Sequence, residues 1–103
     1  MKVVVKDPGQ KPVVQDIENK LEVLQELVDG YIQVVYLDES TAMICNEEGK
    51  RKELFPNFVM GNDVIVGTAI FVGTDDENED FTDIDWFMEQ ILVNNFKNLF
   101  PVF

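Results

Sequence analysis

The sequence contains no histidine, one cysteine and one serine. Without histidine the chain cannot form a Ser-His-Asp triad, a Cys-His dyad or a His-ligated zinc site, and one cysteine cannot form an internal disulfide. Basic residues are also scarce, 8 against 20 acidic ones, which gives a formal charge of −12. This charge repels nucleic acid and anionic membranes, because binding to phosphates depends on lysine and arginine. These absences favour a protein that is not an enzyme, has no cofactor, does not bind nucleic acid directly and suits a basic protein partner.

Long apolar runs are missing as well. Only three consecutive valines follow Met1 and Lys2, too few for the apolar region of a signal peptide, and no stretch approaches the roughly 18 apolar residues of a membrane-spanning helix. We therefore expect no membrane contact, a cytoplasmic location and a reduced thiol at Cys45. The 103 residues, 46% of them apolar, are enough for one folded domain spanning residues 1–103.

Apolar, β-branched segments alternate with turn signals along the chain. Strands are expected at Lys2–Lys6, Lys11–Gln15, Tyr31–Leu37, Thr41–Asn46 and Val64–Val72. Asn19 and Glu22 fit a capping box at the start of an amphipathic helix that Gly30 closes. Thr82 is expected to cap a second helix. The sequence thus predicts an α+β fold, a single domain with an antiparallel sheet of four to five strands and two helices packed on one face.

The densest chemical feature is an acidic segment before the second helix. It places seven carboxylates within eleven residues: Asp75, Asp76, Glu77, Glu79, Asp80, Asp83 and Asp85. A calcium loop matches poorly, because Phe81 stands in place of the turn glycine and Phe87 in place of the bidentate glutamate, so we expect no metal. Two interpretations stay open. The carboxylates are solvated charges that also favour the helix start, or they mimic DNA phosphates and bind a basic protein partner.

The second helix carries two apolar arcs, and one is enough to dock it on a sheet. The second arc consists of Trp86, Val93, Phe96 and Phe100. It is either additional core, covered by the C-terminal tail, or an interface with a partner or with a second copy in a homodimer.

A third group of residues suggests a small-ligand pocket. It comprises Cys45, Asn46, Lys50 and Asn57. A thiol nucleophile needs a neighbouring base or cation, and Lys50 is close in sequence, but a small buried residue is the simpler interpretation of Cys45. The alternative functions are therefore a small-ligand-binding or sequestering domain and, third, an enzyme that uses paired carboxylates. We identify no catalytic residue.

Several segments together resemble a known family. They are Ile17–Tyr36, Cys45–Lys50, Pro56-Asn57, Gly67-Thr68 and Phe71–Gly73. They are similar to small acidic proteins of bacteria and phages catalogued as domain of unknown function 3846, over roughly residues 1 to 85. The resemblance implies an accessory role in a phage or mobile element and supplies no catalytic residues. Phe58 stands where the family usually has arginine, and the last helix is more apolar than is usual there.

Overall fold

The computed structural model describes residues 1–75 and 77–103, without the side chains of residues 78 and 79. Its elements are β1 (Lys2–Lys6), β2 (Val13–Asp16), α1 (Leu21–Val28), β3 (Ile32–Tyr36), β4 (Thr41–Asn46), β5 (Pro56–Met60), β6 (Asp63–Val66), β7 (Ala69–Asp75), β8 (Asn78–Thr82) and α2 (Trp86–Leu99). Within this part of the chain, no helix is long and apolar enough to cross a membrane.

The main sheet has six strands in the order β2-β1-β7-β4-β3, with β8 paired to the end of β7. Each pairing is antiparallel, and Phe71 in β7 lies opposite Val4 on one side and Met43 on the other. β5 and β6 form a separate two-stranded ribbon. The single central strand expected at Val64–Val72 is divided into β6 and β7, because Gly67 between them has a φ of +74°.

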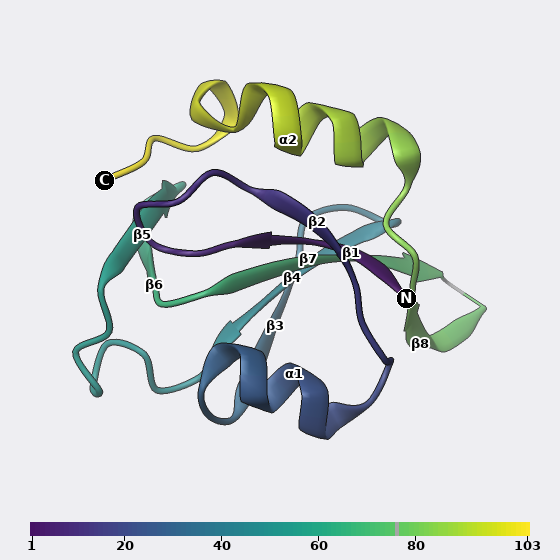
Figure 1. Ribbon diagram of the computed structural model, residues 1–103, viewed down its shortest axis with the longest axis horizontal. Coiled ribbons are helices and arrows are strands. Elements are labelled where there is room, and N and C mark those ends of the chain that lie inside the picture. The colour runs from purple at the N-terminus through teal and green to yellow at the C-terminus, as the bar shows by residue number, and fades with distance from the viewer. Residues whose placement is uncertain (76) are drawn as a thin grey trace.

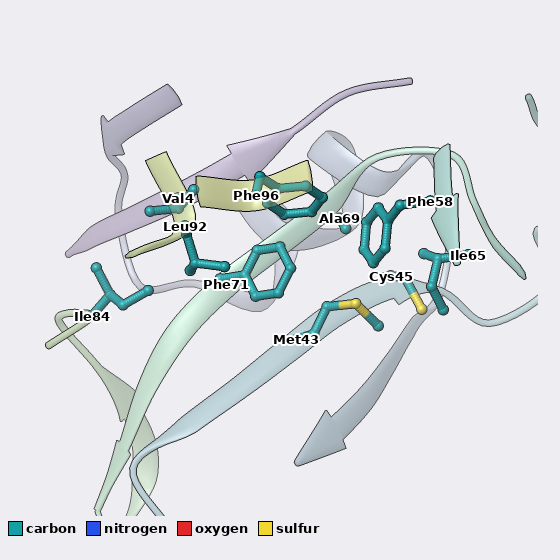
Figure 2. Packing of buried hydrophobic residues seen from close by; sticks show 10 residues of the cluster. All are labelled: Val4, Met43, Cys45, Phe58, Ile65, Ala69, Phe71, Ile84, Leu92 and Phe96. Carbon is teal, nitrogen blue, oxygen red and sulfur yellow. The ribbon is translucent and has the colours of Figure 1, made fainter. Parts of the chain in front are cut away.

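One helix packs on each face of the sheet, as Figure 1 shows with α2 above it and α1 below. Alternate residues of a strand point to opposite faces. Val4, Met43 and Phe71 therefore join the cluster under α2, which Figure 2 shows in detail, whereas Val3 and Ile70 join the cluster over α1. The α+β class is confirmed, but the prediction of both helices on one face is wrong. The strands are apolar on both faces, and each face needs its own cover.

The helix ends also differ from the prediction. Asn19 does not cap α1, because its Nδ2 donates a hydrogen bond to the backbone oxygen of Phe81 at 3.0 Å, and the helix begins after Lys20 without a side-chain cap. Thr82 ends β8, and the residue that caps α2 is Asp85, whose carboxylate accepts from the Met88 N–H at 3.2 Å. The predicted count of four to five strands is also wrong. The main sheet has six strands, because part of the acidic segment pairs with β7 as β8.

Candidate functional site

One end of the sheet carries exposed carboxylates from two separate turns. Asp38 and Glu39 lie in the turn between β3 and β4, and Asp75 and Glu77 lie where β7 turns into β8. The antiparallel pairing of Thr41 with Gly73 brings these turns together. We call the four residues the acidic end. Glu39, Asp75 and Glu77 border an open hollow of about 620 Å³.

Hydrogen bonds hold the two turns in place. The Thr74 N–H donates to the Ser40 carbonyl oxygen at 2.9 Å, and the Thr74 hydroxyl donates to that of Glu39 at 3.2 Å. Within its own turn, Asp38 accepts from the Ser40 N–H at 2.8 Å, which lowers the pKa of its carboxyl group. Asp75 accepts from the Glu77 N–H at 3.0 Å. No acid of the acidic end forms an ion pair within the described residues.

The structure divides the seven acidic residues that the sequence singled out. Asp75 and Glu77 lie at the acidic end, and Asp80 is exposed in β8. Asp83 and Asp85 are exposed but bind backbone: Asp83 accepts from the Lys2 N–H at 2.8 Å, and Asp85 caps α2. Asp76 and the side chain of Glu79 lie outside the described part. Sequence reasoning missed Asp38 and Glu39, which only the pairing of distant strands brings to this surface.

The four residues of the predicted interface on the second helix are likewise not all on one surface. Trp86 and Val93 are exposed, whereas Phe96 is buried and Phe100 packs against the core. The helical geometry is interrupted at Asn95, with φ −134°, just before Phe96. The tail then pairs with β5, where the Val59 N–H donates to the Pro101 carbonyl oxygen at 2.8 Å. Two of the four residues are therefore core, and a homodimer through Trp86 and Val93 stays a prediction.

An open hollow of about 810 Å³ lies beside β4 and β6, where the sequence suggested a ligand pocket. Cys45, Asn46 and Lys50 line it, but Asn57 does not, because it is fully buried and bound to Lys6. The cations here are already paired, Lys50 with Asp63 and Arg51 with Glu48. The Asn46 amide is occupied as well, since it donates to the carbonyl oxygens of Val28 and Asp29 at 2.9 and 3.0 Å. The hollow therefore has little free charge with which to hold an anion.

Cys45 is expected to be an unreactive thiol. Burial raises its pKa, and the Asp63 carboxylate raises it further, so the nucleophilic thiolate is scarce near neutral pH. We expect iodoacetamide at pH 7.5 to alkylate native Cys45 at least about tenfold more slowly than the urea-unfolded chain, and the rate to rise with pH. Mass spectrometry of timed samples measures both rates. Fast alkylation of the native protein would instead indicate an activated nucleophile.

Together these features define a small α+β domain, an antiparallel sheet with a helix on each face and an acidic end. The chain belongs to the family described as Domain of unknown function (DUF3846), whose family model matches residues 1–97. The resemblance seen in the sequence is thereby confirmed, and it extends beyond residue 85 into α2. Searches of curated proteins and of solved structures found no significant match.

Proposed function

We propose that this protein acts in the cytoplasm without catalysis, as an accessory protein of a phage or mobile element that binds a basic protein surface through its acidic end. The partner we propose is a nuclease, whose nucleic-acid groove the carboxylates would occupy in place of phosphates. One observation carries the proposal: two hydrogen-bonded turns present four exposed carboxylates that form no ion pair among the described residues.

The physical case rests on charge and order. A net charge of −12 attracts a basic surface from a distance and raises the rate of encounter. The hydrogen bonds from the Thr74 N–H to Ser40 and from the Thr74 hydroxyl to Glu39 fix the two turns before a partner arrives, so less conformational entropy is lost on binding than with a flexible loop. Since the carboxylates of the acidic end form no ion pair within the described part of the chain, none has to be broken there when a partner binds.

The absence of catalysis is part of the proposal. General acid-base chemistry with carboxylates needs a pair in a desolvated cleft, where one of them has a raised pKa. Glu89 is the only acidic residue of the described part that is buried, and its neighbours are Gln90, which donates to its Oε2 at 3.0 Å, and Lys2, whose Nζ lies 3.9 Å from Oε1. Within the described residues no second carboxylate is paired with Glu89, and this supports a binding function rather than catalysis.

The test is inhibition of DNA cleavage by a panel of purified basic nucleases, with calorimetric titration of any enzyme that is inhibited. We expect binding to weaken at least about tenfold between 50 and 300 mM NaCl, because exposed charges are screened over about 8 Å at physiological salt. Neutralising three of the four carboxylates of the acidic end should weaken binding at least about tenfold at low salt. The test variant is Glu39→Gln, Asp75→Asn, Glu77→Gln.

A matched control removes the same charge elsewhere, on α1 and the loop before β5. It is Glu22→Gln, Glu26→Gln, Glu53→Gln, all at exposed positions. We expect this variant to keep most of the affinity. Equal losses in both variants would show an effect of bulk charge alone, and affinity that does not respond to salt would rule out phosphate mimicry.

A further inference from the structure

A third cavity, apart from the two hollows described above, is lined by several basic residues of this acidic protein. It has a volume of about 300 Å³ and lies between the β1–β2 turn, the end of α2 and the tail, lined by Lys6, Lys11, Pro12, Phe96, Lys97 and Phe103 among others. Lys6 pairs with Ala69 at the start of β7, whereas Asp75 of the acidic end closes that strand, so the two sites lie at opposite ends of the sheet. Three of the chain's 8 basic residues line this one cavity.

Lys6 is a buried cation that forms no ion pair within the described residues. Lys6 is only 3% exposed. Its Nζ donates hydrogen bonds to Asn57 Oδ1 at 2.8 Å and to the Asp7 carbonyl oxygen at 2.9 Å. It also lies 5.7 Å from the centre of the Phe96 ring. An ammonium group has three donors, so one remains. Burial lowers the pKa of Lys6, because a charged group is unfavourable away from water. The nearby Asp7 carboxylate partly offsets this effect.

The other two lysines are exposed, and their ammonium groups form no hydrogen bond or ion pair within the described residues, although acids outnumber bases 20 to 8. Lys97 lies in the last turn of α2, where the helix dipole favours a cation. The dipole does not account for Lys11 in the β1–β2 turn or for the buried Lys6. Phe96, Phe103 and Pro12 add apolar surface to the lining of the same cavity.

We propose that this cavity binds a small organic anion, a phosphate or carboxylate group joined to an aromatic ring. The anionic group would accept hydrogen bonds from Lys6, Lys11 and Lys97 and would add to the counter-charge that the Asp7 carboxylate provides only in part. The ring would pack against Phe103 and Pro12. A volume of about 300 Å³ lies at the small end of the range of ligand pockets, which suits a single ring. The site is independent of the acidic end.

The test titrates the protein with phenyl phosphate, phenylacetate and inorganic phosphate, followed by amide chemical shifts. We expect phenyl phosphate or phenylacetate to bind with shifts centred on residues 6, 11, 97 and 103, at least about tenfold more tightly than inorganic phosphate, because the ring buries apolar area. Lys11→Gln and Lys97→Gln should each weaken binding about five- to tenfold through loss of a charge-assisted hydrogen bond. The matched control, Lys20→Gln, should leave affinity unchanged, since Lys20 pairs with Glu18 on another surface.

Lys6→Met tests the buried cation, and we expect it to abolish measurable binding while circular dichroism reports a folded chain. If that variant does not fold, the comparison of Lys11→Gln and Lys97→Gln with Lys20→Gln decides alone. The proposal is overturned if neither ring-bearing probe binds at 10 mM, if inorganic phosphate binds equally well, or if the shifts centre on Lys50 and Arg51. It is also overturned if the control loses as much affinity as the two test variants.

Discussion

Replacing Asn57 by leucine is expected to lower the free energy of unfolding by about 3–5 kcal/mol, the range for removing one partner of a buried charged group. Asn57 is fully buried, and its amide donates to the backbone oxygens of Lys6 and Gly67 at 2.7 and 2.8 Å. Its Oδ1 accepts from the Lys6 ammonium at 2.8 Å. Leucine has the same branching and number of side-chain heavy atoms but is somewhat larger, so the loss would come from three polar groups that each lose a hydrogen bond and from some overpacking, not from a cavity.

A double-mutant cycle with Lys6→Met separates these contributions. In the absence of the buried ammonium, leucine at position 57 no longer removes a hydrogen-bond acceptor from a charged group. The sum of the stability losses of the two single variants should therefore exceed the loss of the double variant by at least about 1 kcal/mol. Urea unfolding followed by circular dichroism measures all four proteins. Asn98→Leu, at an exposed position of α2, is the control and should change stability by no more than about 0.5 kcal/mol.

The pH dependence of the stability of the same proteins gives an independent test of the role of Lys6. Because the folded state lowers the pKa of Lys6 below its ordinary 10.5, the unfolded chain binds more protons as pH approaches that value. Stability of the parent relative to Lys6→Met should therefore rise with pH in the alkaline range below 10.5. Additive losses in the cycle, or a relative stability that falls over this range, would contradict the assignment.

The local elements were largely predictable from the sequence, because each depends on neighbouring residues. Runs such as Val3–Val5 and Tyr31–Leu37 indicate strands, and the leucine spacing before Gly30 indicates α1. The side of the sheet that each helix covers was not predictable in this way. It depends on which strands become neighbours, and β7, which pairs with both β1 and β4, is distant from both in sequence.

The candidate site shows the same division between local and distant information. The acidic segment is visible in the sequence, but its association with Asp38 and Glu39 requires the pairing of β4 with β7. Asn57 was assigned to a pocket, and strand alternation alone would bury either it or Phe58. The register of β5 shifts between Pro56 and Phe58, and this irregularity lets both neighbours be fully buried. No local pattern in the sequence marks such a bulge.

Phe58→Ala is expected to be as damaging as the loss of Asn57, at about 3–5 kcal/mol. The Phe58 ring is fully buried at the centre of an aromatic cluster, with ring centres 5.0 Å from Phe96, 5.4 Å from Phe100 and 6.1 Å from Phe71, and Figure 2 shows it facing Phe71 and Phe96. Phe96 meets it edge to face, an arrangement that contributes beyond the buried area. Alanine would leave a cavity where the ribbon, the sheet and α2 meet, and the surrounding rings cannot close it without moving α2.

Phe55→Ala is the matched control, because Phe55 belongs to the same stretch of chain but is 79% exposed. We expect a change of no more than about 0.5 kcal/mol there, measured by the same urea unfolding. If Phe58→Ala lost no more than Phe55→Ala, the ring would be dispensable to the core. A large loss confined to Phe58 would instead show that this chain uses the position to anchor its apolar α2 and tail against the sheet.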